Sequence, residues 1–183
     1  ENKVLFVLHG LTGGSEAGYI KMLVETANRA GYRVVVMNHR GINQELKTPK
    51  PYHGGDLSDL EYAVDYVRAK YPNAPMMAVG LSLGGNQMFR YLGKMQEKTD
   101  FLAAALLAVP FDIDACVDAI ENTVYEKFFI KRYLQMNVLP HMHVYNQLKH
   151  THGIDMEDVF KAKSLRDFHS KFTVKIYNHK DVR

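Results

Sequence analysis

Residues 80–84 have the pattern G-x-S-x-G, which is typical of a serine nucleophile on a tight turn. The apolar run 76–79 precedes the pattern, and the helix-compatible run 86–92 follows it. A strand, a sharp turn and a helix would hold the serine hydroxyl at the top of a sheet, and flanking glycines let the strand and helix approach. Ordinary turns also carry this pattern, so the context is what identifies Ser82 as the candidate nucleophile.

Acyl transfer by serine also requires a base, an acid and donors for an oxyanion. The backbone N–H of Leu83, directly after Ser82, is one expected donor. The glycine-rich loop 9–14 follows the first apolar run, and we assign the second donor to its Leu11, with Thr12 as the competing neighbour. A phosphate-binding loop is the alternative for 9–14, but the Lys and Ser/Thr that such a loop needs after its second glycine are missing.

The elements that must position these residues follow from hydrophobic periodicity. Apolar or β-branched runs predict strands over 3–9, 32–38, 76–79 and 103–109. Helical spacing predicts helices over 16–30, ended by Gly31, and after Asp56, which we expect to cap the second helix. Regular alternation of strand and helix predicts an α/β fold, a mostly parallel sheet flanked by helices.

The pattern changes after Pro110, where apolar spacing predicts consecutive helices over 113–120, 124–139, 144–148 and 156–162. We therefore expect a core at 1–110, a helical lid at 111–170, and a return toward the core at 171–183. Such a lid would cover the edge of the sheet where open α/β sheets bind ligands. In the last segment, Phe172, Val174 and Ile176 alternate with polar residues, which predicts a strand ending near Asp181.

Composition excludes several other classes of protein. The formal charge is +3, and the basic residues are scattered, so nothing indicates a nucleic-acid partner. The single cysteine, Cys116, cannot form an internal disulfide, and we expect it to be buried. No signal peptide or membrane-spanning run is visible, so the localisation stays unknown.

The nine histidines are weighed as bases or metal ligands. His9 and His39 lie at expected strand ends, where hydrogen bonding within loops is the favoured role over catalysis. Metal binding is the less favoured role for the cluster at 141, 143, 150 and 152, because no carboxylate or cysteine pattern completes a site. We expect neither a cofactor nor a metal.

Several longer segments resemble the YheT-like family of α/β hydrolases over nearly the whole chain. The matching segments are 9–16, 31–41, 48–49 with Tyr52, 59–61, 71–75, 79–86 and 90–93. The resemblance implies an α/β-hydrolase fold and a serine hydrolase of carboxylic esters, with lipid acyl esters as the small-molecule substrates. It also implies acyl transfer to an alcohol as the alternative reaction, since fungal members include acyl ester synthases.

The resemblance further implies that the catalytic acid and histidine follow a segment similar to 172–182. Early strands and an N-terminal membrane anchor, and with it any membrane contact, would precede Glu1. The chain is therefore expected to be incomplete at both ends, holding the nucleophile and oxyanion donors without the base, and Asp181 is not assigned as the acid. A non-catalytic fragment is the remaining alternative, and we expect low reactivity and poor solubility of the isolated chain.

Overall fold

A computed structural model of the chain describes residues 3–180 and divides them into two compact units. The sheet unit comprises residues 3–39 and Gly54–Phe111. The helical unit comprises Arg40–His53 and 112–180. The segment Arg40–His53 interrupts the sheet unit in sequence but packs with the helices, which the sequence patterns did not predict. Each unit is described by itself.

The sheet unit is built on four parallel strands in the order β2-β1-β3-β4, as predicted from the strand–helix alternation. Their bounds are β1 Val4–Leu8, β2 Arg33–Met37, β3 Met76–Leu81 and β4 Phe101–Leu107. In the register of the sheet, Phe6 of β1 lies between Val35 of β2 and Ala78 of β3. The carboxyl ends of β1 and β3 therefore lie side by side, and the residues that follow each strand meet there.

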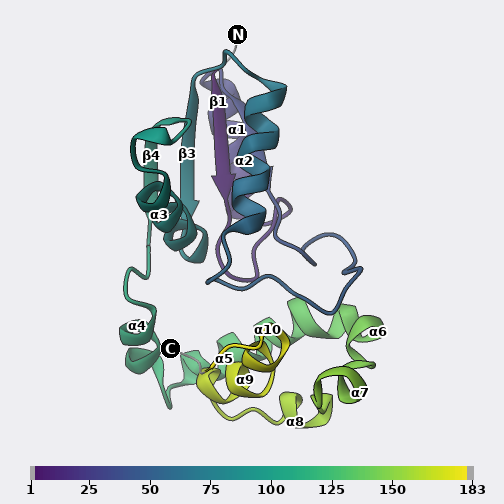
Figure 1. The fold of residues 1–183 in the computed structure, drawn as a ribbon. Coiled ribbons are helices and arrows are strands. Elements are labelled where there is room, and N and C mark those ends of the chain that lie inside the picture. The colour runs from purple at the N-terminus through teal and green to yellow at the C-terminus, as the bar shows by residue number, and fades with distance from the viewer. Residues whose placement is uncertain (1–2, 181–183) are drawn as a thin grey trace. The chain divides into compact units, whose positions relative to one another are not determined.

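Three helices cover the two faces of this sheet (Figure 1). They are α1 Gly18–Arg29, α2 Ser58–Lys70 and α3 Leu83–Met95, and the short 3₁₀ turn η1 Gln96–Lys98 follows α3. Alternate residues of β1 face opposite layers: Phe6 packs in the cluster with α2 and α3, whereas Val7 packs in the cluster with α1. Both are fully buried, as expected for a central parallel strand.

The ends of the first two helices refine the sequence predictions. Gly31, with φ +82°, follows the last residues of α1, and the N–H groups of Gly31 and Tyr32 bond the carbonyls of Asn28 and Ala27. This is a Schellman motif, so Gly31 ends the helix as predicted. Asp56 precedes α2 by two residues, and its carboxylate accepts from the Ser58 N–H at 2.9 Å without occupying the cap position, which is Leu57.

The fourth strand differs from β1 because it lies at the edge of the sheet. Only Phe101 of β4 is buried, and Leu102 is 75% exposed although its sequence is fully apolar. The prediction of a strand here is confirmed, at Phe101–Leu107 instead of 103–109. An apolar run alone does not distinguish a central strand from an edge strand.

The helical unit contains only helical elements among its described residues. They are α4 Ile113–Ile120, α5 Val124–Tyr133, the π-helical η2 Leu134–Val138, the 3₁₀ turn η3 Leu139–His141, α6 Met142–Tyr145, α7 Leu148–His152, α8 Met156–Phe160, α9 Leu165–Lys171 and α10 Thr173–Tyr177. The helix predicted over 113–120 is confirmed. The helix predicted over 124–139 changes to π-helical geometry after Tyr133 and ends near Pro140, which has no N–H to continue it.

The strand predicted over Phe172, Val174 and Ile176 is wrong, because Thr173–Tyr177 forms helix α10. Phe168, Phe172 and Ile176 are buried at a spacing of four residues, so a helical stripe coincides with the alternation seen in the sequence.

Asp181 lies outside the described residues. Cys116 was expected to be buried but is exposed on α4. Over residues 3–180, no helix combines the length and the apolar character that crossing a bilayer requires.

Candidate active site

Ser82 occupies the turn between β3 and α3 in a conformation that residues with a Cβ rarely adopt. Its φ is 52° and its ψ is −119°. Such backbone strain persists only where surrounding contacts hold it. Here the Ser82 N–H donates to the Leu107 carbonyl at 2.9 Å, and the Ser82 carbonyl accepts from the Asn86 N–H at 3.0 Å. The turn is therefore anchored both to β4 and to the first turn of α3.

The glycines flanking Ser82 are required by close backbone contacts. A Cβ on Gly84 would lie 2.4 Å from the His9 carbonyl oxygen, and one on Gly80 would lie 2.7 Å from the Cα of Gly85. A Cβ on Gly85 would approach the Val109 side chain to 2.6 Å. The G-x-S-x-G pattern thus permits α3 to start against the ends of β1 and β3.

The loop after β1 lies directly beside Ser82. A Cβ on Gly10 would be 3.1 Å from the Ser82 Cβ and 3.7 Å from its Oγ. The Gly13 N–H donates to the Gly10 carbonyl at 2.9 Å, and Thr12 has φ 57°, so residues 10–13 form a turn with a positive φ at its third position. The Tyr19 hydroxyl accepts from the Gly10 N–H at 3.1 Å and fixes the start of the loop.

Two backbone N–H groups near this position remain available for an oxyanion. Within residues 3–180, neither the Leu11 N–H nor the Leu83 N–H donates to a protein acceptor. Leu83 is the first residue of α3, where helical N–H groups lack partners and the helix dipole favours negative charge. These are the two residues that the sequence predicted as donors, and that assignment stays a prediction.

His9 has a structural role in the same loop. Its buried ring donates from Nδ1 to the Gly10 carbonyl at 2.8 Å and accepts at Nε2 from the His39 N–H at 3.4 Å. Burial lowers the pKa of His9, against the opposing effect of the bond to Gly10. The ring is therefore neutral, with its proton on Nδ1, and it ties the ends of β1 and β2 together.

Among the described residues of the sheet unit, none bonds to the Ser82 hydroxyl. His141 is engaged elsewhere: its Nε2 donates to the Gly41 carbonyl at 2.8 Å, and its Nδ1 accepts from the Leu46 N–H at 3.4 Å. Both ring nitrogens of this histidine therefore bond backbone groups of the segment Arg40–His53. In the part of the chain that the structure describes, no group of three or more His, Cys, Asp or Glu side chains could hold a metal ion.

Two side chains that the sequence motifs did not indicate bond the backbone of loops next to Ser82. Arg90 on α3 donates to the carbonyls of Gly54 and Gly55 at 2.7 and 3.1 Å. A Cβ on Gly54 would lie 2.9 Å from the Leu83 side chain, so Arg90 holds a chain segment against the candidate oxyanion residue. The Asn38 amide bonds the Ser15 N–H and hydroxyl and fixes the far end of the β1 loop. Such contacts join residues far apart in the sequence, so no short motif predicts them.

Comparison with known proteins is consistent with this geometry. The family model described as the alpha/beta hydrolase fold matches residues 3–153. The chain belongs to the α/β-hydrolase fold family. Mouse Phospholipase ABHD3 is 36% identical over 97% of this α/β hydrolase, and the match covers 43% of the mouse protein. The yeast Monoacylglycerol lipase is 30% identical over 98% of this chain and 41% of its own length. YheT of Escherichia coli is 29% identical over 97% of this chain and 52% of its own length.

The resemblance to YheT-like α/β hydrolases inferred from the motifs is thus confirmed. The chain spans about half, or less, of the length of these relatives. Among solved structures, the esterase EaEST from Exiguobacterium antarcticum is 15% identical, with a TM-score of 0.45 over 73% of this chain and 53% of that chain. That level of similarity adds no information on activity.

Proposed function

We propose that this chain carries the nucleophile and the oxyanion donors of a serine hydrolase that cleaves lipid acyl esters. The observation that carries the proposal is the strained conformation of Ser82, with the Gly10 loop packed against its side chain. The relatives named as a phospholipase and a monoacylglycerol lipase support lipid esters as the substrate class.

In the proposed reaction, Ser82 Oγ attacks the ester carbonyl carbon and transfers its proton to a histidine base. The N–H groups of Leu83 and Leu11 donate to the oxyanion of the tetrahedral intermediate. Collapse of the intermediate releases the alcohol and leaves an acyl group on Ser82, and water then frees the fatty acid. We place the base and its acid in the remainder of a longer protein, because the chain matches less than half of the lipases above and Ser82 bonds to no histidine of the sheet unit.

The test uses a fluorophosphonate probe and a long-chain ester substrate on the full-length protein and on this chain. We expect labelling and hydrolysis by the full-length protein, both removed at least about 10³-fold by Ser82→Ala, and little labelling of the chain alone. Full-length protein that is labelled equally with and without Ser82 would disprove the nucleophile. Ester formation with an added alcohol would instead favour the acyltransferase reaction.

The oxyanion assignment is testable by one substitution. Leu11 is the second residue of the turn 10–13, where proline is well accommodated, so Leu11→Pro removes the N–H and preserves the turn. We expect kcat of the full-length enzyme to fall about 10²-fold or more, while Leu11→Ala, which keeps the N–H, has little effect. An active Leu11→Pro enzyme would move the assignment to Thr12.

A further inference from the structure

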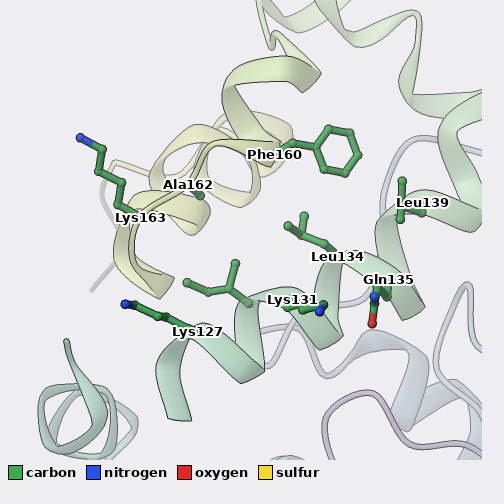
Figure 2. A pocket seen from close by; sticks show the side chains of 9 residues that line it. Lys127, Lys131, Leu134, Gln135, Leu139, Phe160, Ala162 and Lys163 are labelled. Carbon is green, nitrogen blue, oxygen red and sulfur yellow. The ribbon is translucent and has the colours of Figure 1, made fainter. Parts of the chain in front are cut away.

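An open groove lies within the helical unit, and all its lining residues belong to that unit (Figure 2). One wall is a single face of α5 and η2, continuing to Leu139. Its residues follow the helical pattern i, i+3, i+4, i+7, i+8 and i+12: Lys127, Ile130, Lys131, Leu134, Gln135 and Leu139. The opposite wall is Phe160 at the end of α8, with Ala162 and Lys163 in the connection to α9. The volume is about 400 Å³, at the lower end of the range for small-molecule sites.

Buried contacts hold the two walls in place. The Glu126 carboxylate is buried on α5 and accepts from the Leu165 N–H at 2.8 Å and from the Asn122 N–H at 3.0 Å. The rings of Tyr133 and Phe168 pack at 5.2 Å between centroids. Charge-assisted bonds and aromatic packing of this kind fix the spacing of α5 and α9, and with it the width of the groove.

The polar groups around the groove are complementary to an anion. Lys127, Lys131 and Lys163 are exposed, and none of the three ammonium groups is within 4.0 Å of a carboxylate among residues 3–180. The neighbouring Lys161 and Lys171 differ, since they pair with Glu157 and Asp167. Among residues 3–180, no acidic side chain lines the groove. Three lysines that form no ion pair with residues 3–180 therefore border a floor formed by Ile130, Leu134, Leu139 and Phe160. The charge of Lys163 is partly offset by the nearby Asp167 carboxylate.

We propose that this groove binds a free fatty acid, with the acyl chain along the apolar floor and the carboxylate on the lysine ammonium groups. A site of about 400 Å³ suits one acyl chain better than a two-chain lipid. The lysine stems extend the apolar surface while their charged ends remain in water, as an amphiphile with one anionic end requires. The site involves neither Ser82 nor the β1 loop, so the proposal does not rest on the proposed hydrolase function.

The binding test compares decanoate with decan-1-ol, which has the same chain length and no charge, by titration calorimetry on the full-length protein. We expect saturable binding of decanoate, weaker binding of decan-1-ol, and roughly tenfold tighter binding for dodecanoate than for decanoate. Lys131→Gln combined with Lys163→Gln should weaken decanoate at least about threefold. The matched control, Lys175→Gln on α10, should leave the affinity unchanged. Absence of saturable binding, or equal affinity of acid and alcohol, would overturn the proposal.

A diazirine-bearing fatty acid locates the site. After irradiation and peptide mapping, we expect labels in 127–139 and 160–163, in both the native chain and the Ser82→Ala variant. Labels confined to 80–95, or labels lost with Ser82→Ala, would overturn the proposal by placing the ligand at the nucleophile. Because binding is measured without turnover, this result is independent of whether Ser82 hydrolyses esters.

Discussion

The two units of this chain fix their functional residues by different means. In the sheet unit, the position of Ser82 depends on backbone approaches that only glycine allows, such as Gly84 against the His9 carbonyl. In the helical unit, buried side chains bind distant backbone groups, as Glu126 does with Leu165 and His141 does with Gly41. Backbone requirements restrict residue type within a short motif, whereas side-chain bonds of this kind leave no local pattern. The first kind of site is therefore visible in a sequence and the second is not.

The largest expected effect tests the backbone requirement in α3. Gly84→Ala would place a Cβ 2.4 and 2.7 Å from the carbonyl oxygens of His9 and Leu8, neither of which can move freely. We expect the free energy of unfolding to fall by about 3 kcal/mol or more, measured by urea denaturation. Gly93→Ala, in the same helix with no atom within 4 Å, should raise it by about 0.5–1 kcal/mol. Similar values for both variants would show that close backbone contacts do not restrict the residue type at position 84.

A pH-dependent effect is expected in the helical unit. Burial, with a smaller contribution from His53, lowers the pKa of His169 to about 4. The unfolded ring takes up its proton near pH 6.5, so between about 6.5 and 4 the unfolded state binds more protons and stability falls as pH falls. The loss from His169 is about 3 kcal/mol across that window, and this residue adds no further loss below it. His169→Gln should flatten this slope, and the exposed His150→Gln should leave it unchanged.

The buried carboxylate on α5 provides the next test. Glu126→Gln puts an amide NH₂ where two backbone N–H groups need acceptors, so one of them is left unpaired. We expect a loss of about 2 kcal/mol, read by circular dichroism during denaturation. The exposed Glu121→Gln serves as the control. A neutral Glu126→Gln variant would show that side-chain bonds do not fix this unit.

The smallest expected effect concerns Arg90, which bonds the chain segment packed against Leu83. Arg90→Gln removes exposed bonds to the Gly54 and Gly55 carbonyls, so we expect a stability loss of about 1 kcal/mol or less. In the full-length protein the same change should lower kcat more than it changes KM, because Gly54 packs on Leu83. An unchanged kcat would confine Arg90 to a structural role.

The sequence predicted the elements of the sheet unit better than those of the helical unit. Strands at β1, β2, β3 and β4, the parallel sheet and the strand–turn–helix around Ser82 follow from periodicity and from glycine spacing. The helix α10 was misassigned as a strand, since five residues satisfy a period of two and a period near four equally well. The sequence did not identify which strand lies at the edge, because strand order depends on which strands pair.

By itself, the sequence determined the family, the candidate nucleophile and the loop that faces it, because each depends on neighbouring residues whose types the backbone restricts. The tertiary structure alone decided that Arg40–His53 packs with the helices, held by His141 and by the Tyr177 hydroxyl, which donates to the Pro51 carbonyl from 126 residues away. It alone brought Lys131 and Lys163 to one groove. Contacts over such separations are set by packing of whole elements, and that packing has no signature in any short segment.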